Sequence, residues 1–578
     1  MRFWLFSLFF SFCSMTIGQL AHPFIYSDTV KVDRRIGGKL DSIDLMFKFQ
    51  SSTIPGGAGA GYSDNILKTN WLRTNPNGQR FFSYNAWSGY RYSGIPHVGF
   101  AYAFGAQGTQ LVMAQYEQGY RGNVMLNIDF LKNRSNGFLR NSSFDHNELQ
   151  LKLFRNGEVY SFDLKSSFEK SLVSHSGGVA LDSVADEFPL IFIPVNKQVA
   201  EVNTQRSRIE LINYFDFYKD TNKAFGVYTS HDLKIKNYKY LENGNLASLY
   251  PVINYDSSNT FDQHQWSQVG NGAGFFLKKG YQFLSCGADV QFWNFQNLGF
   301  YADTLEVDLV GKYYVNSEKI SLTEDMSWNV LGAQKEFYND LHLKYHLPRF
   351  DIFGQLLYQH LLPEYYQRFS TGNNYFSAEN IEKQQLIDLK VGSEYDFGAQ
   401  CIQLEYECAG ANNNYWFVDS IWRNDTLDNV VFQSIEFSAD LKVRRWSFHP
   451  EYKLTLNEKN LGIIPVHQFR TRILVKGGLF KAKKMIAYGG LDLCAYSSFS
   501  LIGMNAINST FRLDGPGNFN NGWTNAHLFG GFQIEEFKFY VRIENLGYFW
   551  NDPNLELMNR FPIPSTSFRL GLTWDFFN

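Results

Sequence analysis

Residues 148–165 read ELQLKLFRNGEVYSFDLK, with apolar and polar side chains alternating on both sides of Asn156-Gly157. A period of two indicates half-buried β-strands, and an Asn-Gly pair is a strong signal for a two-residue hairpin turn. A turn at this pair makes one face of the hairpin apolar, with the cross-strand pairs Leu153–Tyr160, Leu151–Phe162 and Leu149–Leu164. The stretch therefore predicts an antiparallel hairpin with one apolar and one polar face.

Two further hairpins are expected at Arg444-Arg445 and Glu535-Glu536. Their apolar pairs are Leu441–Phe448, Phe437–Tyr452, Ile534–Phe537, Phe532–Phe539 and Leu528–Ile543. Other tight turns are predicted near Gln118-Gly119, Lys279-Gly280, Asn316-Ser317, Pro348-Arg349 and Lys481–Lys484. Long polar segments lie between them, near 166–205, 240–271, 361–385, 409–432, 501–525 and 546–567. Short turns that alternate with long loops are typical of an outer-membrane β-barrel.

The composition favours a membrane barrel over a soluble sheet protein. The 578 residues include 54 Phe, 34 Tyr and 12 Trp, and the net charge is −3. This much apolar surface excludes a disordered chain, and the lack of a basic surplus argues against nucleic-acid binding. A soluble sandwich would need a second layer over every apolar face, whereas a membrane barrel turns these faces to lipid. We therefore expect Leu151, Phe162, Phe437 and Phe539 to contact outer-membrane lipid.

The first 18 residues, MRFWLFSLFFSFCSMTIG, have the features of a cleaved signal peptide. Arg2 precedes an apolar run, and small residues stand before Gln19. A transmembrane anchor is the alternative, but the run is shorter than the ~20 residues that a bilayer core takes. Residues 19–41 are then a short periplasmic segment. Residues 42–578 are predicted to form an all-β fold, a single transmembrane antiparallel β-barrel of roughly 16–22 strands with short periplasmic turns and long extracellular loops.

The chain ends on an amphipathic strand. Its apolar face consists of Phe568, Leu570, Leu572, Trp574 and Phe576. An aromatic-rich terminal strand matches the sorting signal read by the outer-membrane assembly machinery, which is an expected partner. Phe577 and Asn578 follow, so the last residue is not aromatic. We predict an integral protein of the cell outer membrane.

Several stretches resemble the putative porin family of Bacteroidota outer membranes. They are Tyr228–Lys234, Ile464-Pro465 before Gly478-Leu479-Phe480, Arg542–Asn545, Phe561–Pro564 and Phe568–Phe576. The resemblance extends over most of the chain. It implies a barrel of porin character and supplies no catalytic residues.

No motif in the sequence predicts an enzyme, a cofactor or a metal site. The glycine-rich run 55–61 lacks the Gly-Lys-Ser/Thr of a phosphate loop. His342 and His346 share a strand face but are about 13 Å apart, too far for one metal ion. Neighbouring carboxylates such as Glu306 and Asp308 are commonly pore-facing. Four cysteines remain after the signal peptide, too few for a disulfide framework.

Two functions are compatible with these features. The first is a porin-like channel for passive diffusion of small polar solutes. The second is a structural or accessory barrel that docks a secretion or uptake partner without an open pore. A polar stripe on nearly every strand favours the channel. Its predicted pore-lining cations are Arg470, Arg472, Lys476, Lys538, Arg542 and Arg569. They would give the channel weak anion selectivity, or they pair with loop carboxylates and leave the selectivity unchanged.

Overall fold

The structure is a computed structural model that describes residues 93–577. Within this range it leaves out 122, 181–188, 221, 298–299, 333–334, 364, 370, 377–381, 399, 414, 419–420, 425–428, 459–463, 481–483, 502, 508–509, 513–518 and 553–554. The predicted signal peptide, the periplasmic segment 19–41 and the first part of the predicted barrel, 42–92, lie outside the described residues.

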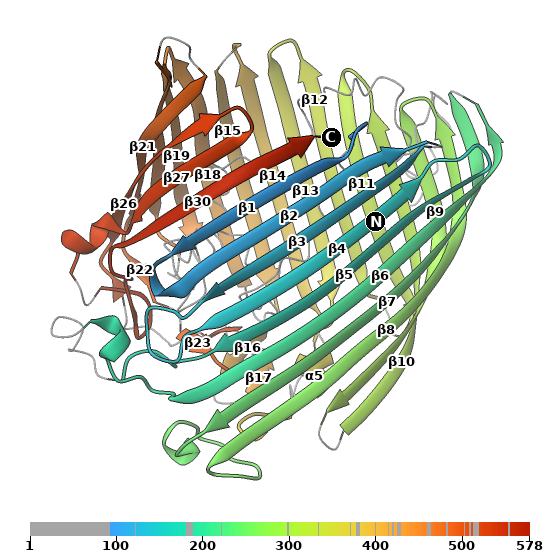
Figure 1. Ribbon diagram of the computed structural model, residues 1–578. Coiled ribbons are helices and arrows are strands. Elements are labelled where there is room, and N and C mark those ends of the chain that lie inside the picture. Colours follow the sequence, from blue (N-terminus) through green and yellow to red (C-terminus); the bar gives the residue numbers. More distant parts are fainter. Residues whose placement is uncertain are drawn as a thin grey trace.

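Twenty-two strands form one antiparallel sheet, and the last strand pairs with the first to close a barrel (Figure 1). The first eleven are β1 (His97–Gly105), β2 (Thr109–Tyr120), β3 (Val124–Ser135), β4 (Phe144–Arg155), β5 (Tyr160–Ser174), β6 (Val199–Lys219), β7 (Lys223–Asn243), β8 (Asn259–Lys279), β9 (Gln282–Asn297), β10 (Phe300–Asn316) and β11 (Ile320–Leu331). The others are β12 (Phe337–Leu347), β13 (Phe350–Leu361), β14 (Gln384–Asp396), β15 (Cys401–Asn412), β18 (Asn429–Val443), β19 (Trp446–Glu458), β20 (His467–Leu479), β21 (Met485–Tyr496), β26 (Trp523–Ile534), β27 (Phe537–Glu544) and β30 (Ser567–Phe577). Closure removes the sheet edges that lipid could not hydrogen-bond.

Short turns connect the strands at one end of the barrel and long loops connect most of them at the other. We call these the turn end and the loop end. The loops contain helix α5 (Tyr365–Phe369), the 3-10 turns η2 (Ala106–Gly108), η3 (Leu190–Phe192), η4 (Leu246–Ser248) and η5 (Leu546–Phe549), and the strand pairs β16 (Tyr415–Val418) with β17 (Ile421–Asn424), β22 (Phe499–Ser500) with β25 (Phe519–Asn520), β23 (Gly503–Asn505) with β24 (Thr510–Arg512), and β28 (Glu556–Met558) with β29 (Phe561–Pro562). In an outer-membrane barrel the turn end is periplasmic and the loop end extracellular.

The predicted alternation of turns and loops is confirmed over the described residues, with two corrections to the loop lengths, while most of the turn predicted at Lys481–Lys484 lies outside them. The segment 240–271, expected to be a loop, mostly continues β7 to Asn243 and β8 from Asn259. The loop expected over 166–205 is shorter, because β5 runs to Ser174 and β6 starts at Val199. Both errors have one cause: at these strand ends apolar side chains lie on both faces, with Val202 and Tyr240 buried inward and Leu241 and Phe261 exposed outward, so the alternation is lost.

The registers predicted for the two hairpins with charged turns are confirmed: Leu441 pairs with Phe448, and Phe532 with Phe539. The register predicted at Asn156-Gly157 is wrong by four residues, since Leu151 pairs with Ser166 and Leu153 with Leu164. Neither Asn156 nor Gly157 has the positive φ of a type I′ turn. Instead, the Lys219 ammonium donates to the Asn156 side chain and the Gly157 carbonyl, which holds a wider turn.

The register differs from the predicted one by four residues. Because this number is even, each side chain stays on the face of the sheet where it was predicted. The outer face carries Phe130, Leu149 and Phe168, which are 37–48% exposed, and Phe437 at 37%. Leu151, Phe162 and Phe539 share this outer face at partly exposed positions. Inward neighbours such as Lys152 and Asp163 are buried. Among the described residues, no helix has the length and apolar character needed to cross a membrane.

Candidate functional site

The inner wall of the barrel is charged, and its charges are unevenly distributed. Over β9–β19 the register places carboxylates on the inner face in adjoining pairs, such as Asp289 beside Asp308 and Glu405 beside Glu436. The inward carboxylates of this wall are Asp289, Glu306, Asp308, Asp325, Asp340, Asp351, Asp388, Glu394, Glu405, Glu407, Glu436, Asp440 and Glu451. The inward lysines of the same strands are Lys312, Lys344, Lys390, Lys442 and Lys453. This acidic wall therefore has a large carboxylate surplus.

Lysines of the acidic wall bridge carboxylates on neighbouring strands. The Lys390 ammonium lies 3.2 Å from Glu405 and 3.1 Å from Glu407. Lys344 likewise contacts Asp351 at 2.8 Å and Glu394 at 3.1 Å. Each bridge lowers the repulsion between two like charges, and this holds the wall together without removing its negative surplus.

The predicted pore-lining cations belong to the adjoining wall, β20–β30, which we call the basic wall. Arg470 on β20 and Arg542 on β27 both contact the Asp492 carboxylate of β21, at 3.6 and 3.5 Å. Arg542 also lies 3.7 Å from Glu544, which Arg569 of β30 contacts at 3.1 Å. These ion pairs connect β20, β21, β27 and β30, which are four of five consecutive strands next to the seam where the barrel closes, with β26 between β21 and β27.

The six cations differ in exposure. Arg470, Arg472 and Lys538 are partly exposed and Lys476 is exposed, whereas Arg542 and Arg569 are 0% and 2% exposed. The structure thus brings Arg470, Arg542 and Arg569 together through shared carboxylates. Lys538 lies in the second position of β27 and Lys476 three residues before the end of β20, so both are nearer the turn end.

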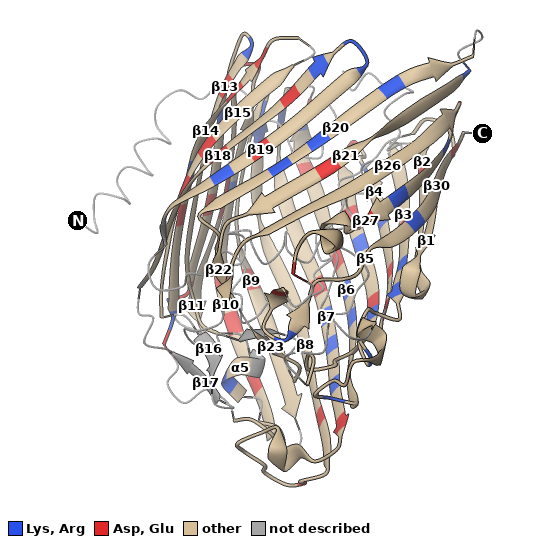
Figure 2. Ribbon diagram, turned by 90° about the vertical axis from the view of Figure 1, so that its left-hand side faces the viewer, with Lys and Arg blue, Asp and Glu red and all other residues tan. Residues whose placement is uncertain are grey.

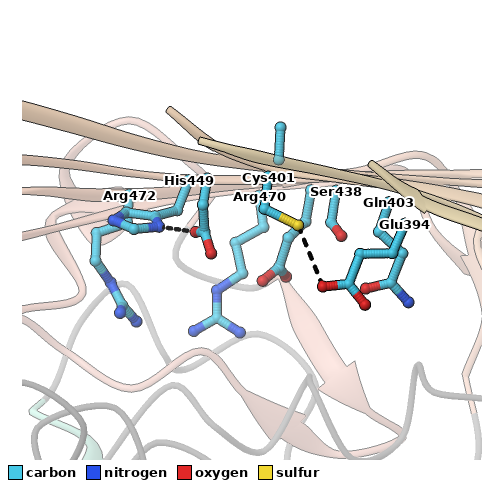
Figure 3. A pocket seen from close by; sticks show the side chains of 10 residues that line it. Glu394, Cys401, Gln403, Ser438, His449, Arg470 and Arg472 are labelled. Atoms are coloured by element: carbon cyan, nitrogen blue, oxygen red, sulfur yellow. Dashed lines mark hydrogen bonds and ion pairs between the residues drawn. The ribbon is translucent and has the colours of Figure 1, made fainter. Parts of the chain in front are cut away.

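A recess of about 360 Å³ lies where the two walls meet (Figure 3). Its lining comes from β14, β15, β18, β19 and β20, and consists of Glu394, Cys401, Gln403, Ser438, Ala439, Asp440, His449, Glu451, Arg470 and Arg472. In Figure 3 the Arg470 and Arg472 side chains extend away from the sheet. The two arginines are two residues apart on one strand face, or about 7 Å. The recess can therefore offer guanidinium donors and carboxylate acceptors to one polar solute.

Sequence reasoning missed the acidic wall, although the signal was present. On β15 and β18, Glu405, Glu407, Glu436 and Asp440 all have the parity of the polar face. Counting the polar-face charges strand by strand would have found the surplus. From the sequence we expected the inward charges of the whole barrel to balance, with Arg206, Arg208, Lys442 and Lys453 offset by Glu210, Glu436, Asp440 and Glu451, and the surplus on β9–β19 contradicts this expectation.

Inward-folded loops cover the loop end of the lumen (Figure 2). In the ring, β7 is the seventh strand and β21 the nineteenth, so they lie on roughly opposite sides. The loop that follows β21 reaches β7, where the Tyr238 hydroxyl donates to the Ile507 carbonyl. From the β13–β14 loop, the Asn373 backbone N–H donates to Asp262 of β8 at 2.9 Å, and the Asn374 side chain accepts from Thr260 at 2.6 Å.

A buried apolar cluster consolidates this loop cover. Its members outside the barrel strands come from five loops and are Phe138, Leu139, Val179, Leu190, Ile193, Val195, Ile464, Phe499, Leu501, Leu557, Met558, Phe561 and Ile563. Such packing is that of a small protein core. The long segment expected over 166–205 contributes part of this cover through its described residues between β5 and β6.

The β5–β6 loop is also tied down by polar contacts. The Lys197 ammonium lies 2.6 Å from Glu242 of β7 and 4.3 Å from the centre of the Tyr250 ring. Tyr250 donates to the second Glu242 oxygen at 2.5 Å. Burial, with a smaller contribution from Lys197, lowers the pKa of His175 in the same loop to about 3. This histidine is therefore neutral in the folded protein.

Among the described residues, no group of His, Cys, Asp and Glu side chains is arranged to hold a metal ion. The described cysteines Cys286, Cys401, Cys408 and Cys494 are free thiols. The Cys401 thiol donates to Glu394 at 3.4 Å in the recess (Figure 3).

A family model described as a putative porin matches residues 79–578. The chain belongs to the putative porin family. This confirms the predicted resemblance at the level of the family, while the assignment to Bacteroidota stays a prediction. A 22-strand barrel of this family is an outer-membrane transport barrel, and such barrels are normally not enzymes.

Solved structures with a similar fold include receptors and a transporter. The siderophore receptor PirA from Acinetobacter baumannii superposes with a TM-score of 0.60 at 10% identity, covering 84% of this chain and 81% of that one. The copper transporter OprC gives 0.60 at 11% identity, covering 85% and 82%. The ferric-catecholate import receptor Fiu from E. coli K12 gives 0.55 at 10% identity, covering 84% and 82%. At these identities the likeness concerns the fold alone. No match was found among curated proteins.

Proposed function

We propose that this porin is a channel for the passive diffusion of small polar solutes. The charged inner wall carries the proposal. Ionised side chains there are exposed to the lumen, as in the pair of Lys312 and Asp325, whose side chains are 67% and 43% exposed. An apolar or tightly packed interior would serve a purely structural barrel better, because isolated buried charges are costly.

The six cations of the basic wall have separate roles in this proposal. Arg470, Arg472, Lys476 and Lys538 line the solute path. Arg542 and Arg569 are buried and hold Asp492 and Glu544, and thereby support the wall. The terminal residues Phe568, Leu570, Leu572, Trp574 and Phe576 act as the sorting signal for the assembly machinery. A signal peptide over 1–18 delivers the chain to the periplasm.

The alternative, an accessory barrel without an open pore, is favoured by one observation, the loop cover. If the cover does not open, solutes cannot cross, and the loop end would serve as a docking surface for a secretion or uptake partner. The two proposals therefore differ in whether the native protein conducts.

Planar-bilayer conductance of the purified full-length protein distinguishes them. A matched variant replaces residues 499–520 of the β21–β26 loop with a short Gly-Ser linker. Discrete steps from the native protein support the channel, and larger steps from the variant are then expected. Steps from the variant alone would overturn passive diffusion in favour of a closed barrel. No steps from either, with both proteins folded, would reject a channel altogether.

A further inference from the structure

The apolar belt on the outside of the barrel ends abruptly along one register row of β3–β7. The last continuous apolar row is Phe130, Leu149 and Phe168, which pair across β3, β4 and β5, and isolated apolar residues such as Leu172, Leu241 and Phe261 lie beyond it. The next outward row toward the loop end consists of Lys132, Asn147, Lys170, Gln205, Asn237 and Gln265. The row beyond it consists of Arg134, Asp145, Leu172, Asn203, Lys239 and Gln263. The outer face thus changes from apolar to polar within about 7 Å.

Four cations stand in these two rows, and we call Lys132, Arg134, Lys170 and Lys239 the outer basic patch. Lys132 lies 4.0 Å from Asp145, with both side chains about one-third exposed. Arg134, Lys170 and Lys239 are exposed and make no ion pair with any residue that the structure describes. The carboxylates nearest in the register are Asp145 and, one row further out, Glu201. The patch therefore keeps a positive surplus.

The patch is local. On the other side of the barrel, outward residues near the loop ends include Gln433 on β18, His467 on β20 and Thr524 on β26. Cations at β3, β5 and β7 are separated by two strand spacings each, or about 10 Å. Asn147, Asn203 and Gln205 occupy three of the four intervening positions on β4 and β6, and Asp145 occupies the fourth. The arrangement offers several anion sites side by side, each flanked by hydrogen-bond donors.

We propose that the outer basic patch binds the phosphate-bearing headgroup of a glycolipid in the outer leaflet. Its height supports this, because it begins where the lipid-facing belt ends and lies on the extracellular side. Its chemistry agrees as well. Arginine and lysine pair with phosphate oxygens, and the amides of Asn147, Gln205 and Asn237 suit sugar hydroxyls. A soluble anion would gain nothing from the adjoining Phe168, whereas an acyl chain beneath the headgroup contacts it.

The test measures binding of fluorescent bis-phosphorylated lipid A to the full-length protein in neutral detergent. The variant carries Lys132→Gln, Arg134→Gln, Lys170→Gln and Lys239→Gln. A matched control carries Arg155→Gln and Lys223→Gln, two exposed outward cations at the turn end. Phosphatidylcholine labelled with the same dye reports binding to the belt alone. Heat-dependent gel migration verifies that each barrel is folded.

We expect the patch variant to bind lipid A at least tenfold more weakly, and the control to stay within twofold of the native protein. Native binding should weaken with salt, and the patch variant should lose most of this dependence. Equal losses in both variants, or an unchanged patch variant, would overturn the proposal. If the fourfold variant does not fold, Lys170→Gln and Lys239→Gln are tested singly, and unchanged binding in both would have the same meaning.

Discussion

An arginine at Phe437 should destabilise the barrel far more than one at Phe539, although both positions face lipid. Phe437 lies six residues from Val443, the last residue of β18 at the turn end. A strand residue rises ~3.3 Å, and a tilt of ~40° leaves ~2.5 Å along the membrane normal. Phe437 is then about 15 Å from the turn end, near the middle of an apolar band about 25 Å tall. Phe539 is two residues from Phe537 at the start of β27, or about 5 Å from that end.

This difference in depth sets the magnitudes. Phe437→Arg should cost about 2–4 kcal/mol of unfolding free energy, and Phe539→Arg about 1 kcal/mol or less. The assay is urea unfolding of the protein in phospholipid vesicles. Phe437→Ala separates the loss of the ring from the gain of a charge. Ser438→Arg is the matched control, because it places the same charge one residue away on the lumen side.

The reasoning would be refuted in either of two ways. Equal costs at Phe437 and Phe539 would mean that depth along the strand does not measure depth in the membrane. A Ser438→Arg cost as large as that of Phe437→Arg would mean that the two faces are not distinguished by lipid.

Three further outcomes are expected. Deleting residues 568–578 removes the strand that pairs with β1 and β27, so the truncated protein should be degraded in the periplasm, and normal outer-membrane levels on a blot would contradict this. The carboxylate surplus of the acidic wall opposes the weak anion preference expected from the basic wall, and reversal potentials of the native protein in a salt gradient decide between them. Reversing Arg470 and Arg472 to Glu, with the buried Arg542 left in place, should shift the reversal potential toward cations, and an unchanged potential would contradict a place for these arginines on the solute path. His175 has a folded pKa of about 3 against 6.5 when unfolded, so its contribution to stability is full above pH 6.5 and falls as the pH drops toward 3. The urea concentration at the midpoint of unfolding should therefore differ more between pH 7.5 and pH 4.5 for the native protein than for His175→Gln. Equal pH dependence of the two proteins would contradict a lowered pKa of His175 in the folded state.

The barrel could be predicted from the sequence because alternation within a strand and the residues of a short turn are both local features of the chain. Alternation with a period of two assigns faces without knowledge of the partner strand, and this is why Phe437 and Phe539 were placed on the outside. The registers at Arg444-Arg445 and Glu535-Glu536 were also correct, because a two-residue turn leaves one possible pairing. At Asn156-Gly157 the turn is wider because Lys219 of β6 donates to the Gly157 carbonyl. Lys219 is 62 residues away in the sequence, so the local pattern around the turn could not predict this contact.

The loop cover obeys different rules from the barrel that it closes. Asn373 meets Asp262 across 111 residues of sequence, and Tyr238 meets Ile507 across 269. These contacts depend on the ring having closed, since only closure brings β7 opposite the loop after β21. The loop cover buries its apolar side chains among its own loops, as a soluble domain does. The barrel strands instead place their apolar side chains on the outer, lipid-facing surface. An apolar residue therefore indicates a lipid-facing position in a barrel strand but a buried position in the loop cover, and the sequence pattern alone does not distinguish the two cases. The charged walls below the cover are held apart by the barrel itself, so the cover can rearrange without collapse of the lumen. Whether solutes pass consequently depends on the stability of the loop contacts rather than on that of the strands.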